Sequence, residues 1–330
     1  MDSLLFAIGA VAPIVLMVSI GYLLKRIGFM SADFARAANK LVFRVFLPSM
    51  LFLNVYRIEN LAQMDFSYVL YTVAVLLVIF SLSIPAVLCI TRRGDRRGVL
   101  IQASFRSNYA LIGIPLASSL FGEAGSIVAT LLSAVVIPML NVLAVVSLTV
   151  FREQEGKRPS VKSILLGIAK NPLIQSVLLG IVMLGLRAMF VEWGVSFRLS
   201  DVKPLFTVLS YLSNLATPLA LLVLGAQFEF SAVPALKKEL IYGILVRVLV
   251  VPLIGVGTAY LLFANRFSGA HFAAFVAMFC TPVAVSSVPM AQERGGDTVL
   301  AGQLVIWTTL FSALTVFIAS FLLRAVGIFA

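Results

Sequence analysis

Long apolar runs recur along the whole chain and limit what it can fold into. The runs at 4–24, 66–90 and 205–228 contain no charged residue. About 20 apolar residues in a helix cross the roughly 30 Å hydrocarbon core of a bilayer. The sequence therefore predicts an all-α polytopic membrane protein.

Ten such segments are predicted, at 4–24, 37–56, 66–90, 98–121, 125–151, 163–187, 205–228, 239–263, 271–292 and 298–324. Hydrophobic residues make up 61% of the 330 residues and charged residues only 12%, whereas soluble domains are roughly half apolar and a quarter charged. Lys25 and Arg26 follow the first run and no Lys or Arg precedes it, so we expect a retained helix and no cleaved signal peptide.

The basic residues gather in alternate loops, and we attribute the net charge of +11 to membrane orientation, with no nucleic-acid partner. By the positive-inside rule the richer side faces the cytoplasm. We therefore expect a multi-pass protein of the cell (inner) membrane, with both termini outside and a cytoplasmic central loop. The residues on the richer side are Lys25, Arg26, Arg36, Lys40, Arg92, Arg93, Arg96, Arg97, Arg152, Lys157, Arg158, Lys162, Lys237, Lys238 and Arg294.

Prolines indicate an internal repeat with an offset of about 170 residues. The matching pairs are Pro48 and Pro218, Pro85 and Pro252, and Pro115 and Pro289. We predict two five-helix repeats, 1–151 and 163–330, joined by a short linker at 152–162. Because five is odd, the copies must be inverted relative to each other, an arrangement typical of secondary transporters.

Two segments, 106–115 and 281–289, interrupt their apolar runs with polar residues and proline. Asn108 lies eleven residues past Arg97, and Pro282 lies eleven residues past His271. At 1.5 Å per residue both reach about 16 Å into the membrane from opposite sides. Mid-helix proline frees polar backbone, which a membrane tolerates only where protein or a water-filled cavity surrounds it. We predict two broken helices, the fourth and the ninth, that face one substrate site; two ordinary proline kinks are the alternative.

The string Asn108-Tyr109-Ala110-Leu111-Ile112-Gly113-Ile114-Pro115 resembles the Asn-x-x-x-x-Gly-Ile-Pro signature in the fourth helix of the auxin efflux carrier family. The resemblance extends over essentially the whole chain. It implies inverted five-helix repeats, a crossover of helices four and nine where organic anions bind, elevator-like movement and homodimerisation. The short central loop, and Pro282 where a second Asn would be sought, favour a prokaryotic carrier of small organic acids over a carrier of auxin.

Arg106 is the charge that most needs a partner. It lies about 13 Å deep by the same helical rise, and no Asp or Glu lies at the centre of any predicted span. A carboxylate substrate could supply the missing charge, or the guanidinium could bind carbonyls freed at the crossover. Both interpretations stay open. We expect a structural role for Arg247, which is similarly deep.

Asn108 is the strongest single candidate, because its amide can donate to a carboxylate and hold opened backbone. Asn141 either lines the site or joins helices. The remaining predicted substrate-binding residues are Ser286, Ser287, Gln303 and Thr281, and the predicted crossover residues are Gly113, Pro115, Pro282 and Pro289.

These features predict a secondary transporter for a small organic anion, a mono- or dicarboxylate, rather than an enzyme. We expect no cofactor and no metal site, and the coupling ion, Na⁺ or H⁺, stays open. A sodium-coupled symporter that resembles bile acid carriers is one alternative. A membrane sensor without transport is another.

Overall fold

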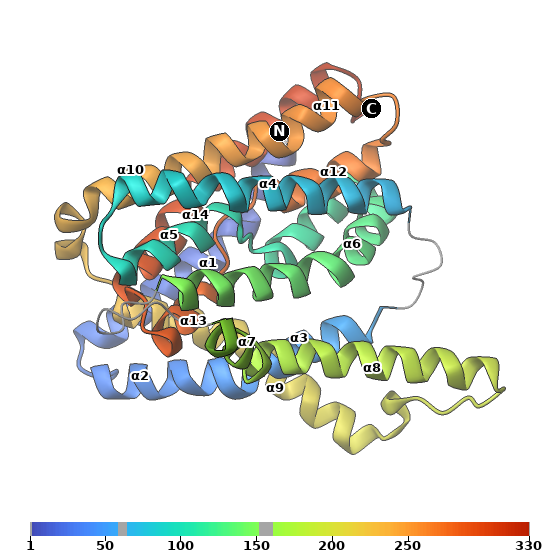
Figure 1. Cartoon of the computed structure of the whole chain (residues 1–330), viewed down its shortest axis with the longest axis horizontal. Coiled ribbons are helices and arrows are strands. Elements are labelled where there is room, and N and C mark those ends of the chain that lie inside the picture. The colour runs from blue at the N-terminus through green and yellow to red at the C-terminus, as the bar shows by residue number, and fades with distance from the viewer. Residues whose placement is uncertain (1, 59–64, 152–160, 330) are drawn as a thin grey trace.

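The computed structural model describes residues 2–58, 65–151 and 161–329, and all regular elements in this part are helical (Figure 1). Residues 152–160 of the predicted linker lie outside it. The elements are α1(Asp2–Arg26), α2(Ala32–Leu41), η1(Val42–Phe46), α3(Leu47–Tyr56), α4(Phe66–Ile90), α5(Gly94–Phe105), η3(Tyr109–Gly113), α6(Ile114–Val150), α7(Val161–Ala169), α8(Pro172–Glu192), η4(Leu199–Asp201), α9(Lys203–Gln227), η5(Phe230–Ala232), η6(Pro234–Leu236), α10(Lys237–Leu245), η7(Val246–Val250), η8(Leu253–Gly257), α11(Thr258–Phe263), α12(Gly269–Phe279), α13(Ser287–Arg294) and α14(Thr298–Ala325).

Helices lie over every predicted apolar segment, which confirms the all-α polytopic class. Seven helical stretches in the described ranges are long and apolar enough to cross a membrane: Ala32–Tyr56, Phe66–Ile90, Tyr109–Val150, Pro172–Glu192, Lys203–Gln227, Pro234–Phe263 and Thr298–Ala325. By contrast α5 has 12 residues and α12 has 11, too short to cross alone. Both belong to the segments predicted to be broken.

The predicted boundary between 98–121 and 125–151 appears as a sharp turn inside α6. Phe121 (φ −142°, ψ 28°) and Gly122 (φ 58°, ψ −147°) leave helical geometry. A positive φ is readily adopted only by glycine. The two parts of α6 pack closely, because a Cβ added to Gly125 would lie 2.3 Å from the backbone oxygen of Ala117.

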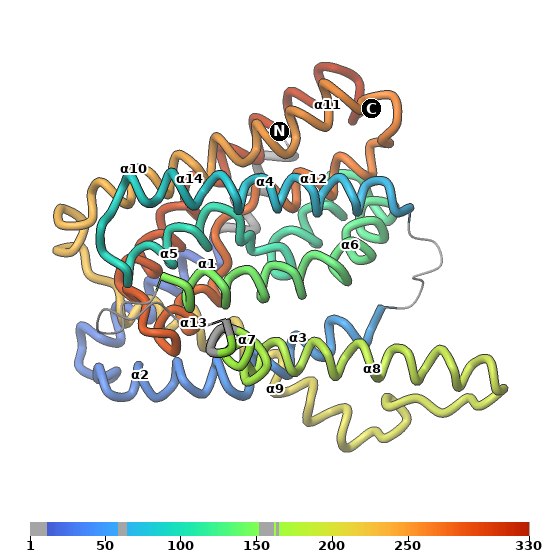
Figure 2. The backbone as a smooth tube through the Cα atoms, viewed as in Figure 1, coloured from blue at the N-terminus to red at the C-terminus, as the bar shows by residue number. Residues whose placement is uncertain are grey.

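The helices form two bundles that lie against each other (Figures 1 and 2). In the first bundle α3 packs against α8 and α9, and α9 also contacts α1 and α2. In the second bundle α6 packs against α5 and α12, α4 against α5, and α14 against α10 and α13. In Figure 1 α2, α3, α8 and α9 lie at the bottom and α4, α10 and α12 at the top. Each bundle therefore combines helices from both halves of the sequence.

Three charged side chains join the starts of α5, α10 and α14 in the second bundle. Arg96 donates from Nη1 to Glu239 Oε1 at 2.8 Å and from Nε to Asp297 Oδ2 at 3.0 Å. The three side chains are 13%, 9% and 12% exposed. Asp297 also caps α14 by accepting a hydrogen bond from the Leu300 amide at 2.9 Å. This cluster fixes three helix ends relative to one another.

We expect Arg96→Gln to destabilise the protein by about 3 kcal/mol, because it leaves two largely buried carboxylates without their cation. Thermal unfolding of the purified protein in detergent measures the effect. Arg93→Gln is the matched control, since Arg93 pairs with Asp95 at the surface, where its side chain is 59% exposed, and such pairs contribute about 1 kcal/mol or less. Equal losses in the two variants would contradict the structural role of the cluster.

Candidate functional site

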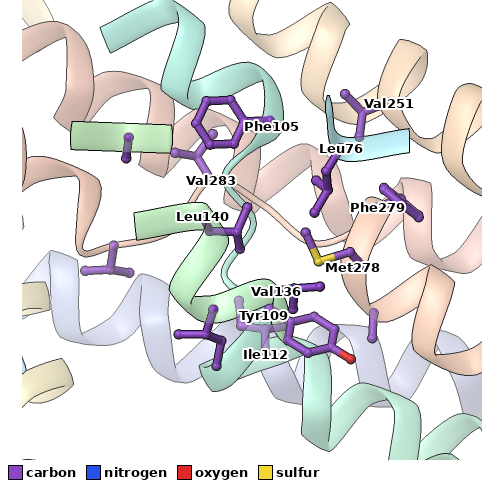
Figure 3. Packing of buried hydrophobic residues seen from close by; sticks show 14 of the residues in the cluster. Leu76, Phe105, Tyr109, Ile112, Val136, Leu140, Val251, Met278, Phe279 and Val283 are labelled. Atoms are coloured by element: carbon purple, nitrogen blue, oxygen red, sulfur yellow. The ribbon is translucent and has the colours of Figure 1, made fainter. Parts of the chain in front are cut away.

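Both predicted helix breaks are present, and they lie against each other. α5 ends at Phe105, and α12 ends at Phe279 and is followed by a non-helical segment up to α13. Ser107 and Val283 form an antiparallel β-bridge. The amide of Asn108 donates to the carbonyl of Pro282 at 2.8 Å, and the amide of Ala284 donates to the carbonyl of Arg106 at 3.2 Å. Figure 3 shows the two segments crossing among Phe105, Leu140, Met278 and Val283.

The two prolines take different places in their helices. Pro289 is the third residue of α13, and a missing amide is tolerated in the first turn of a helix, where that donor has no intrahelical partner. The expectation that Pro289 lies in mid-helix was therefore wrong. Pro115 is the second residue of α6, but α6 continues directly from η3, which begins at Tyr109. Pro115 therefore lies inside a helix, as predicted.

Pro282 and Gly113 lie at the crossing itself. Pro282 has no amide to donate, but its carbonyl is the acceptor for Asn108. Gly113 allows close approach, because an added Cβ would lie 2.9 Å from both the backbone oxygen of Ala277 and the Tyr109 ring.

Arg247 binds the carbonyl groups freed at the end of α12. Its Nε donates to Thr281 O at 2.8 Å, and its Nη2 donates to Thr281 O at 2.7 Å and to Met278 O at 3.1 Å. The side chain is 1% exposed. A cation at a helix C-terminus also complements the negative end of the helix dipole. The contacts agree with the structural role expected for Arg247.

Arg106 binds side chains and no freed carbonyl. Its Nη2 donates to Asn141 Oδ1 at 2.8 Å and to Ser286 Oγ at 3.0 Å. Its Nη1 makes longer contacts, 3.4 Å to Gln102 Oε1 and 3.3 Å to Met290 Sδ. Arg106 is 3% exposed, and no Asp or Glu of the described ranges pairs with it. It is a buried cation held by neutral partners.

Asn108 adds an unused donor beside this cation. The side chain is 8% exposed, and its Nδ2 has no hydrogen-bond partner in the described part of the chain. Asn141 instead donates from Nδ2 to Ile137 O, one turn earlier in α6, at 2.9 Å. The side-chain amide of Asn141 thus orients Arg106, whereas Asn108 Nδ2 is an unpaired donor among the described residues.

A small cavity of about 60 Å³ lies between the two bundles, with room for a few water molecules. The breaks and α6 form one wall, which includes Arg106, Ser107, Asn108, Asn141 and Ser286. The first bundle supplies the opposite wall: Leu47, Met50, Leu51, Leu173, Ala216, Thr217 and Ala220. The cavity is therefore polar on one side and mostly apolar on the other.

Four of the seven predicted substrate-binding residues meet at this cavity, namely Arg106, Asn108, Asn141 and Ser286. The other three are outside its lining and make different contacts. Thr281 donates from Oγ1 to Ala277 O at 2.8 Å, and Ser287 has a buried hydroxyl without a partner. Gln303 donates to Glu229 O at 2.6 Å and accepts from Trp307 Nε1 at 3.0 Å.

Thr217 is a cavity residue that the sequence analysis missed. It directly precedes Pro218, which marked the repeat, and that neighbour is the one signal that could have drawn attention to it. The apolar residues of the same wall carry no sequence signal, because they resemble any other helix face.

The described residues contain no group of three or more His, Cys, Asp or Glu side chains that could hold a metal ion. The chemistry available at the cavity is one guanidinium, one free amide donor and hydroxyl groups. Donors of this kind are able to bind an anion.

A family model described as "Membrane transport protein" matches residues 6–320. The chain belongs to this family, the auxin efflux carriers. The resemblance of the Asn108–Pro115 string is thereby confirmed, and the protein is a membrane transporter.

Two archaeal relatives carry names of the same kind. An uncharacterized transporter of Methanothermobacter thermautotrophicus is 26% identical over 307 residues, which cover 92% of this chain and 93% of the relative. An uncharacterized transporter of Methanocaldococcus jannaschii is 24% identical over 241 residues, which cover 71% of this chain and 72% of the relative.

Arg247→Gln is expected to destabilise this transporter, because it leaves the carbonyls of Met278 and Thr281 buried without donors, at about 1–3 kcal/mol for each group. Thermal unfolding in detergent checks the loss. Arg106→Gln is the matched comparison, since its partners are side chains and glutamine can still donate to them; we expect its melting temperature to stay closer to that of the wild type.

Proposed function

We propose that this transporter carries a small monocarboxylate, which binds in the cavity between the two bundles. The observation that carries the proposal is Arg106, a buried cation without an acidic partner in the described ranges, whose guanidinium lines that cavity. A buried charge is costly unless it is paired. A single bound carboxylate would neutralise Arg106 and accept hydrogen bonds from it.

The other donors fit the same ligand. Asn108 Nδ2 is free to donate to a carboxylate oxygen. Asn108 and Ser286 also directly precede η3 and α13, so the positive ends of both half-helices lie at the cavity. These features favour an anion over a neutral or cationic substrate.

The wall opposite Arg106 favours one carboxylate over two. It consists of aliphatic side chains and Thr217, with no cation. The second carboxylate of a dicarboxylate would lose hydration there without gaining a partner, which costs several kcal/mol. Small monocarboxylates with an apolar tail suit both walls of the cavity.

Transport follows if the bundles move against each other. Both breaks belong to the second bundle, so we propose that this bundle moves with the anion along the first, as an elevator. All ten segments would cross the inner membrane as two inverted repeats, with the face bearing Arg96 and Lys237 on the cytoplasmic side and both termini outside. The observed antiparallel pairing of the two breaks supports this arrangement.

Uptake into proteoliposomes tests the substrate class. Acetate, propionate, lactate, malonate and succinate would be offered as radiolabelled anions, with and without Na⁺ or H⁺ gradients. We expect uptake of the monocarboxylates to exceed that of the dicarboxylates at equal concentration. Preference for dicarboxylates would contradict the single-cation site, and dependence on Na⁺ would favour the symporter alternative. Absence of flux for every anion would favour a sensor.

Arg106→Gln should raise the half-saturating substrate concentration at least about tenfold, because a charge-assisted hydrogen bond contributes about 1.5–3 kcal/mol and a factor of ten equals 1.4 kcal/mol. Asn108→Ala should have a smaller effect in the same direction. Concentration series in the proteoliposome assay measure both. Unchanged transport in the two variants would reject the site.

Two neighbouring serines provide a matched pair. Ser286 accepts a hydrogen bond from Arg106 and lines the cavity, whereas Ser287 does neither. We expect Ser286→Ala to weaken substrate binding severalfold and Ser287→Ala to leave uptake unchanged. Equal effects would mean that Ser286 has no special place in the site.

A further inference from the structure

A second, larger cavity lies between α1 and α14, away from the substrate site. Its volume is about 330 Å³, within the range of ligand pockets. Most of its lining is apolar: Val15 and Val18 from α1, Phe228 after α9, and Ile306, Trp307 and Leu310 from α14. The lining residue Leu23 is 58% exposed, and Leu16 on the same helix is 61% exposed. The cavity therefore opens onto the apolar side of the helices.

The length of this cavity matches one leaflet of a membrane. Along α1 its lining extends from Ile14 to Leu23, which is about 14 Å at the helical rise. One leaflet contributes half of the roughly 30 Å hydrocarbon core, about 15 Å, which is close to this length. An acyl chain that lies along α1 would fill the cavity from its polar end toward the middle of the bilayer.

Two basic side chains, Lys25 and Arg26, lie at the polar end of the cavity, and few acidic side chains lie near them. Arg26 donates from Nε and Nη2 to the hydroxyl of Tyr22, a lining residue, at 2.9 and 2.7 Å. No carboxylate of the described residues pairs with Arg26. Lys25 lies 3.8 Å from Glu229, and both side chains are partly exposed, at 38% and 52%. Such a pair is weak, so the two cations can bind a phosphate.

A hydrogen-bond chain connects the cavity to the backbone beside it. Trp307 forms part of the wall and donates to Gln303, which in turn donates to the carbonyl of Glu229. Gln303 is 1% exposed and takes no part in the substrate cavity. Its contacts hold the wall of the α1–α14 cavity and the acidic residue at its mouth in fixed positions.

We propose that the α1–α14 cavity binds an anionic phospholipid, with one acyl chain along α1 and the phosphate at Lys25 and Arg26. Basic pockets between transmembrane helices on the cytoplasmic side are suited to anionic headgroups. α1 belongs to the first bundle and α14 to the second, so this lipid touches both. Its occupancy would influence how readily the two bundles move against each other.

Tryptophan quenching tests the proposal directly. The chain has two tryptophans, so Trp193→Phe leaves Trp307 as the only reporter. This variant would be reconstituted in vesicles of unlabelled phosphatidylcholine. One sample would contain a small fraction of phosphatidylglycerol brominated on its acyl chains, and the other the same fraction of brominated phosphatidylcholine. We expect brominated phosphatidylglycerol to quench Trp307 with at least about fivefold higher apparent affinity, the preference that one cation confers.

Two pairs of variants separate the binding site from general lipid contact. Arg26→Gln should reduce the preference for phosphatidylglycerol severalfold, whereas Arg92→Gln, an exposed arginine elsewhere, should not. Ser19→Phe places a ring in the cavity and should reduce quenching by both lipids, whereas Ser81→Phe on the exposed side of α4 should not. Equal quenching by the two lipids in the Trp193→Phe protein, or no effect of Arg26→Gln, would overturn the proposal.

Discussion

The pairing of two broken helices is the interaction on which the rest of the structure depends. α5 and α12 stop inside the protein, and their open backbone would be costly in a membrane unless it found partners. Asn108 and Ala284 donate across the crossing to Pro282 and Arg106. Val283 donates to Thr308 Oγ1 at 3.1 Å, so α14 also supports the crossing. The second bundle is organised around these bonds.

Two deeply buried arginines serve this crossing in opposite ways. Arg247 donates from Nε and Nη2 to the carbonyls at the end of α12, and backbone dipoles thereby stabilise its charge. Arg106 meets only neutral side-chain acceptors on the cavity side. The first cation completes the fold, and the second is the positive charge on which the proposed anion site rests. Their positions in the sequence look alike, but their partners differ.

Both cavities lie at the contact surface between the two bundles, here called the seam. The cavity lined by Arg106 and Asn108 lies on this seam, with polar groups from one bundle and aliphatic groups from the other. The α1–α14 cavity lies on it as well, in contact with both bundles. Away from the two cavities the bundles also contact each other through an ion pair, from Arg44 of the first bundle to Glu293 of the second at 3.3 Å.

The sequence alone determined the all-helical membrane class, the two breaks and the family string, because length, hydropathy and proline spacing are local properties. It also singled out Arg106, Asn108, Asn141 and Ser286. Only the tertiary structure decided which buried arginine binds backbone and which lines a cavity. It also placed Thr281, Ser287 and Gln303 outside the lining of that cavity and Thr217 within it. Those distinctions depend on contacts between residues far apart in the chain, which no local pattern encodes.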